Sequence, residues 1–133
     1  MIRIARIVGA TDERTRNLVV VDGGQKTHVH CGADVLLSGL YQDVSGTSIC
    51  PVCGKETRMV IVAGRLASVD PQSALLHYVV EDQRRFSICC EATFVFDKEE
   101  CLKTWLGSHD GASGKTSSLP EFMNEASARR GPR

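Results

Sequence analysis

Short runs of strand-forming residues, each closed by a turn signal, most constrain the fold of this chain. Val, Ile, Tyr and Phe recur in these runs, while glycines, charged residues or an Asp-Pro pair lie between them. The runs predict strands at 2–10, 17–24, 25–30, 57–64, 75–82 and 84–96, of which 84–96 is the strongest.

Two other segments have helical character. Residues 33–44 place apolar side chains at helical spacing, and Ser38 and Gly39 limit this helix to a short one. Residues 97–109 begin with an aspartate that favours helix capping and continue with an acidic first turn. Together the patterns predict a small α+β domain with an antiparallel or mixed sheet and two or three helices.

The chain length favours one domain. A chain of 133 residues predicts a single domain over 1–133, large enough for a hydrophobic core without disulfide bonds. Within it we expect a loop at 46–56 and a turn or extended link at 68–73. From about 110 to 133 the sequence predicts a loop and a tail, with a frayed helix at 121–130.

The charge distribution excludes several classes of partner. Sixteen basic and sixteen acidic residues give a formal net charge of zero, and the basic residues are scattered. We therefore expect neither a nucleic-acid partner nor an anionic membrane surface. The apolar runs are too short to span a membrane, and the first residues lack the apolar core of a secretory signal. These features predict a cytoplasmic protein.

Six cysteines are many for such a chain, and a reducing compartment favours ligands, nucleophiles or buried thiols over disulfides. Cys31 lies at the predicted start of the first helix, where backbone N–H groups lower a thiol's pKa. Asp34, three residues later, lies on the same helical face. A buried small residue and a helix-capping carboxylate are the simpler interpretations of this pair.

Cys89 and Cys90 are adjacent on the predicted strand 84–96, so their side chains should point to opposite faces. Cys90 would share its face with Ile88 and other apolar residues, which predicts a structural role. Cys89 would lie on the mixed face, where a site could form.

Cys50 and Cys53 have the spacing of half a zinc knuckle, but no second pair with this spacing follows. Four ligands could be completed only in an irregular arrangement, by His28, His30, Cys31, Cys89 or Cys101. A turn with two packed cysteines is the alternative. Cys101, beside Leu102 and Trp105, is most simply a core residue. We therefore expect that the protein does not require zinc to fold.

The order of these motifs resembles a known family. "HCGAD" before an apolar helix, a cysteine in a middle loop, "VDP" and then "RRFSICC" are similar to the catalytic core of the organomercurial (alkylmercury) lyases. The resemblance runs from about Asn17 to Trp105. It implies that the fold resembles that core and that Cys31, Asp34 and Cys89 form the catalytic site and bind mercury.

The same resemblance implies the remaining roles. Cys50 would be structural, and Arg85 falls at a family position. The implied reaction is protonolysis of a carbon–mercury bond, which gives a hydrocarbon and Hg(II) held by two cysteines. It needs no organic cofactor, because the metal belongs to the substrate. Low-molecular-weight thiols would remove the Hg(II), and mercuric reductase would accept it, as in mercuric resistance.

The sequence also departs from the family. Only about thirty residues precede Cys31, so we expect the usual N-terminal helical domain to be absent. His30 replaces an aromatic residue of the best-known members, and Cys53 has no counterpart in them. The alternative function is a non-catalytic thiol module that binds mercury or zinc.

Overall fold

A six-stranded antiparallel sheet forms the larger layer of the protein. The computed structural model describes residues 7–21, 24–109 and 114–130. The strand order is β1-β3-β2-β4-β5-β6. In chain order these strands are β1 (Ala10–Thr11), β2 (Asn17–Val21), β3 (Lys26–Val29), β4 (Val44–Ile49), β5 (Glu56–Val62) and β6 (Arg65–Asp70).

Two smaller antiparallel sheets complete the β structure. One has the order β10-β7-β11 and the other pairs β8 with β9. Their strands are β7 (Leu75–Tyr78), β8 (Val80–Asp82), β9 (Ser87–Ile88), β10 (Phe94–Phe96) and β11 (Lys115–Ser118).

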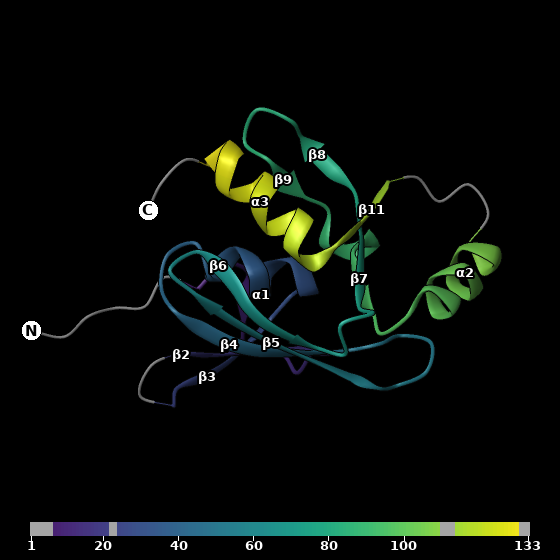
Figure 1. Cartoon of the computed structure of the whole chain (residues 1–133), viewed down its shortest axis with the longest axis horizontal. Coiled ribbons are helices and arrows are strands. Elements are labelled where there is room, and N and C mark those ends of the chain that lie inside the picture. Colours follow the sequence, from purple (N-terminus) through teal and green to yellow (C-terminus); the bar gives the residue numbers. More distant parts are fainter. Residues whose placement is uncertain (1–6, 22–23, 110–113, 131–133) are drawn as a thin grey trace, which may run out of the picture.

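Helices α1 (Gly32–Ser38) and α3 (Leu119–Arg130) lie on one side of the large sheet, whereas α2 (Glu99–Ser108) lies at one end of the molecule (Figure 1). Along β5, buried and exposed residues alternate, so one face of the sheet holds the core and the other meets solvent. All seven residues of α1 are buried, because the sheet lies on one side of it and α3 and β10 on the other. The α+β class predicted from the sequence is confirmed.

Most predicted elements are present, with four differences. The expected loop at 46–56 is strand β4 up to Ile49, and the expected link at 68–73 is strand β6 up to Asp70. The predicted strand 84–96 is broken by the 3-10 helix η1 (Cys90–Ala92). Of the strand predicted at 2–10, residues 1–6 lie outside the described residues, and pairing begins only at Ala10.

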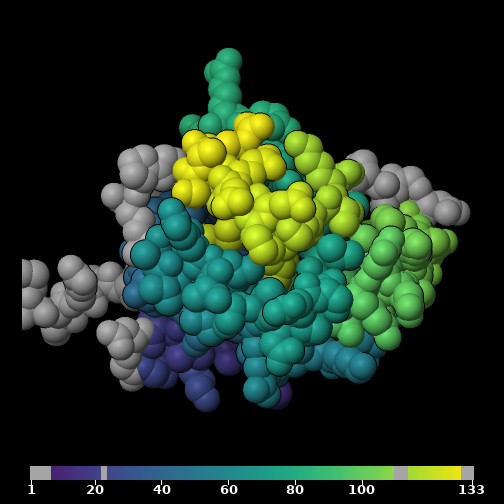
Figure 2. Space-filling model, in the orientation of Figure 1, coloured from purple at the N-terminus to yellow at the C-terminus, as the bar shows by residue number. Residues whose placement is uncertain are grey.

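The helix expected at 121–130 is present as α3, but it packs into the core instead of fraying, and residues 115–118 form a strand where a loop was expected. Strand β11 pairs with β7, and α3 follows it directly. The buried residues of α3 are Leu119, Phe122, Met123 and Ala126. Their spacing is that of one helical face, and this face closes the core above α1 and β6. In the space-filling view α3 covers the middle of the molecule, and α2 lies at its edge, apart from α3 (Figure 2).

No helix among the described residues is long and apolar enough to cross a membrane.

Candidate functional site

Cys31 and Asp34 enter the site from the first turn of α1. Strand β3 ends at Val29, and Cys31 is the residue at which the helix begins. Cys31 is 1% exposed and Asp34 is 4% exposed, so both are buried in the core between sheet and helix. The helical turn brings the two side chains to the same side of α1, as the sequence predicted.

Cys90 supplies the second thiol. It begins η1, and its Sγ accepts a hydrogen bond from the Cys31 thiol at 2.9 Å. The Cys90 thiol in turn donates to Asp34 Oδ2 at 3.3 Å. The three ligand atoms lie within 4.8 Å of one another, and both cysteines are free thiols. A thiol, a second thiol and a carboxyl group thus form one chain of hydrogen bonds.

The structure does not place Cys89 in this group. Its backbone N–H donates to the Val79 carbonyl, and its carbonyl accepts from Thr93 Oγ1. The prediction that Cys90 lies on the face away from the site is wrong, because its thiol meets Cys31 and Asp34; the structural role predicted for it stays a prediction. The predicted facing assumed strict alternation along one strand, and the turn of 3-10 helix at Cys90 ends that alternation. The catalytic role that the resemblance gives Cys89 stays a prediction.

The expectation of a low thiol pKa at Cys31 is also wrong. The thiol donates its hydrogen bond to Cys90, and this bond, together with burial and the nearby Asp34 charge, raises the pKa of Cys31 well above its usual range. The Asp34 backbone N–H lowers the pKa, as the helix start predicts, but it is outweighed. Cys31 is therefore a protonated thiol until a metal or a base takes its proton.

Burial raises the pKa of Asp34 above its ordinary value, while hydrogen bonds from the Cys90 thiol and the Cys31 backbone N–H act in the opposite direction. The second of these bonds is the capping contact that the simpler interpretation of Asp34 predicted. Asp34 therefore caps the helix and also contacts the thiols.

A cavity of about 250 Å³ lies next to these groups. Cys90 lines it, together with polar residues such as Arg16, Asn17 and His30 and with Phe94. Cys31 and Asp34 are not among the residues that line it. Of the three site residues, a molecule in the cavity therefore contacts Cys90.

The segment before β1 closes the site on another side. His30 N–H donates to the Gly9 carbonyl at 3.1 Å, and Val8 N–H donates to Ser38 Oγ at 2.8 Å. Gly9 has φ +72°, and a Cβ added there would lie 2.0 Å from Asp34 Oδ2. This position therefore requires glycine, and its backbone packs directly on the carboxyl group. Sequence reasoning missed Gly9, for which no motif gives a signal.

A second group of potential ligands lies just past the ends of β4 and β10. Cys50, Cys53, Asp97 and Cys101 bring their ligand atoms within 4.8 Å of one another. Asp97 was expected to cap α2, but Lys98 occupies the cap position and no side chain caps the helix. The sequence analysis placed Cys101 in the core. The four-residue spacing of Asp97 and Cys101 was the signal that could have linked them.

The chain resembles known proteins both in sequence and in fold. The model of the family described as alkylmercury lyase matches residues 10–129. A solved structure described as "Crystal structure of the mercury-bound form of MerB2" has a TM-score of 0.75 and 21% identity over 92% of this chain. The chain covers 61% of that protein, and at this identity the likeness concerns the fold. A search of curated proteins finds no match. Because the family model spans nearly the whole chain, the chain belongs to the alkylmercury lyase family.

Proposed function

We propose that this chain is an organomercurial lyase, which cleaves the carbon–mercury bond of R–Hg–SR′ by protonolysis. The observation that carries the proposal is the hydrogen-bonded chain of Cys31, Cys90 and Asp34 beside a cavity. Mercury is a soft metal and prefers thiolate ligands. The carbon that leaves needs a proton from an acid within hydrogen-bond reach.

The first step is thiol exchange at Cys90, the thiol that lines the cavity. The Cys90 sulfur binds mercury, the external thiolate leaves, and the Cys90 proton departs with it as R′SH. This places R–Hg beside Cys31 and Asp34 without creating a free charge in the buried site.

The second step uses the buried pair. The Cys31 thiol gives its proton to the Asp34 carboxylate as its sulfur binds mercury. Two thiolates then push electron density toward carbon, and protonated Asp34 delivers the proton to carbon. The products are R–H and Hg(II) held by Cys31 and Cys90, with Asp34 again a carboxylate.

Release of mercury completes the cycle. Two external thiols exchange with the two cysteines, which gives Hg(SR′)₂ and restores both protein thiols. No organic cofactor takes part in this scheme. We expect it to operate in the cytoplasm as part of mercury detoxification, with mercuric reductase as an acceptor of the released Hg(II).

A module that binds mercury without cleavage is the second candidate. The same two thiols would capture the metal in either case, since softness drives that step. The two candidates differ only in the transfer of the proton to carbon.

The deciding experiment measures hydrocarbon release. The purified protein is incubated with methylmercury or phenylmercury and excess thiol, and the headspace is analysed for methane or benzene by gas chromatography. We expect catalytic release that depends on Cys31, so the Cys31→Ser variant should release none. Stoichiometric mercury capture by the unmutated protein without hydrocarbon would make the chain a binder.

A further inference from the structure

Four metal-ligand side chains from three separate segments converge beside α2, outside the Cys31–Asp34–Cys90 site. Cys50 and Cys53 come from the turn between β4 and β5, Asp97 from the end of β10, and Cys101 from α2. We propose that this cluster, here called the α2 cluster, binds one structural Zn²⁺ through three thiolates and one carboxylate.

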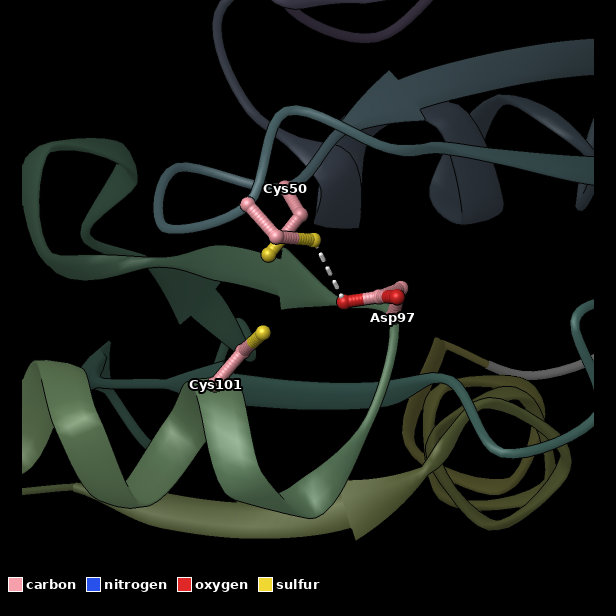
Figure 3. A group of neighbouring side chains, drawn as sticks. Cys50, Asp97 and Cys101 are labelled. Atoms are coloured by element: carbon pink, nitrogen blue, oxygen red, sulfur yellow. Dashed lines mark hydrogen bonds between the residues drawn. The ribbon is translucent and has the colours of Figure 1, made fainter.

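The geometry suits a tetrahedral ion. A zinc–sulfur bond of about 2.3 Å places the sulfurs of a tetrahedral site about 3.8 Å apart. The four ligand atoms lie within 4.8 Å of one another, so shifts of about 1 Å at most form the site. Figure 3 shows the Cys101 sulfur and the Asp97 carboxylate pointing toward the space beside Cys50.

Hydrogen bonds within the turn between β4 and β5 fix the backbone that carries Cys50 and Cys53. Cys50 N–H donates to the Lys55 carbonyl at 2.9 Å, and Gly54 N–H donates to the Cys50 carbonyl at 3.0 Å. Gly54 has φ +76°, a conformation that glycine adopts without strain and that brings the chain back toward β5. The turn thereby keeps the Cys50 and Cys53 sulfurs within 4.8 Å of the Asp97 and Cys101 ligand atoms.

Asp97 is the second, independent observation. Asp97 is 4% exposed, it does not cap α2, and its carboxylate accepts a hydrogen bond from the Cys53 thiol at 2.9 Å. None of the ion pairs among the described residues includes it. A buried carboxylate outside any ion pair is costly, whereas a divalent ion among the thiols would offset its charge.

The ligand set favours zinc over other ions. Magnesium and calcium take oxygen ligands, and iron–sulfur clusters are usually held by four cysteines. Zinc accepts thiolates and carboxylates in a closed four-coordinate site and has no geometric preference of its own. The satellite core around α2 is small, with Cys50, Phe96, Cys101 and Leu102 as its buried members. A metal would join α2 to the turn after β4 and to the end of β10, in addition to the contacts of Trp105 with Phe94 and Phe96.

This proposal replaces the expectation of a zinc-independent fold. That expectation rested on the Cys50–Cys53 half-site alone, and Asp97 and Cys101 now stand where a second half-site is needed.

Metal analysis of the full chain tests the proposal. Protein purified without chelators should contain about one zinc per chain, as measured by elemental mass spectrometry. Reconstitution with Co²⁺ should give the visible bands of a tetrahedral ion and a thiolate-to-cobalt charge-transfer band. Removal of the metal should accelerate hydrogen exchange in α2 and leave the amides of β2, β4 and β5 protected.

Variants locate the site. Cys101→Ser should lose most of the zinc and about a third of the charge-transfer intensity, since one of three thiolates is gone. Asp97→Asn should keep the charge-transfer band and change the visible bands. This variant tests the site if Cys101→Ser does not fold. Cys90→Ser removes a thiol from the other group and should keep the full zinc content. Unchanged zinc in both cluster variants, or no zinc and no cobalt bands in the unmutated protein, overturns the proposal.

Discussion

Asp34 is a carboxyl group whose surroundings suit it to carry a proton. Burial raises its pKa, and the two groups that donate to it are the Cys90 thiol and the N–H of Cys31. Both thiols that would bind mercury are therefore hydrogen-bonded to the same acid, directly or through one another. The acid stays within reach of the metal and of the carbon attached to it.

Asp34→Asn is expected to separate mercury capture from cleavage. The amide accepts hydrogen bonds but does not deliver a proton, so hydrocarbon release should fall by about 10²–10⁴-fold. Mass spectrometry should still detect the mercury adduct, because two thiols remain. Near-normal release by a folded variant would move the proton donor to another group.

The same variant has an expected signature in stability. The folded-state pKa of Asp34 is raised from 3.8, so its stabilising contribution is present below that value and is lost as pH rises through the folded pKa. Asparagine has no such dependence. The melting temperature of Asp34→Asn relative to the parent should therefore rise as the pH is increased from 3.8 through the folded-state pKa. A constant difference across this range would contradict the raised pKa.

Gly9→Ala is expected to disturb the acid without touching a thiol. The new Cβ would lie 2.0 Å from Asp34 Oδ2, so the carboxyl group must move. A displacement of this kind should reduce hydrocarbon release by roughly 10²-fold. Gly24→Ala is the matched control, because φ is +83° there and nothing lies within 4 Å of the added Cβ. Both variants should lose about 1–2 kcal/mol of stability from the backbone alone, and only Gly9→Ala should lose activity.

At the scale of elements, one turn of 3-10 helix decides which of two adjacent cysteines meets α1. A continuous strand from Ser87 to Phe96 would present Cys89 and Cys90 on opposite faces. In the structure the strand stops at Ile88, the chain turns through Cys90–Ala92, and β10 begins at Phe94. The turn carries the Cys90 thiol to Cys31, and Cys89 stays at the cap of η1.

The two serine variants of this pair therefore have a defined expected order. Cys90→Ser should abolish hydrocarbon release, because it removes the thiol that lines the cavity and contacts both partners. Cys89→Ser should keep most of it. The reverse order, measured on folded proteins, would assign the second thiol to Cys89, as the family resemblance implies, and would require a different path for residues 89–93.

At the scale of the whole molecule, α3 closes the core. Phe122 is fully buried and packs edge-on against Tyr78, with ring centroids 4.9 Å apart, and also contacts Phe86. These aromatic residues join the end of the chain to β7 and to the turn before β9. Residues that the sequence analysis placed in a tail are therefore part of the folding unit.

Phe122→Ala is expected to destabilise the protein by about 3–5 kcal/mol, because it leaves a cavity between three elements. Asn124→Ala, on the exposed side of the same helix, should change stability by less than about 0.5 kcal/mol. Chemical denaturation of both variants measures the difference. A small effect of Phe122→Ala would show that α3 docks loosely.

The sequence predicted the parts of the molecule that local patterns determine. Strands β2, β3 and β5 and helices α1 and α2 follow from alternation, helical spacing and turn residues. Cys31 and Asp34 were found because one helical turn fixes their relation. The meeting with Cys90 was missed, because it depends on a break at Cys90–Ala92 inside a segment whose aromatic and β-branched residues predict one continuous strand. Asp97 was missed as a partner of Cys50, and Cys101 was one of five possible partners that the sequence could not rank, because 47 or more positions separate both residues from Cys50 along the chain.

The cavity beside Cys90 and the α2 cluster adjoin the same two strands, β4 and β10, and this has a consequence for the lifetime of the protein. Ser48, which lines the cavity, is followed two residues later by Cys50, and Val95, also at the cavity, is followed by Asp97. Under the proposed functions, the reaction product is a thiophilic ion made beside thiolates that hold the fold. Exposed Cys53 is where such an ion would begin to displace zinc. The number of turnovers before inactivation should then depend on how quickly external thiol carries mercury away.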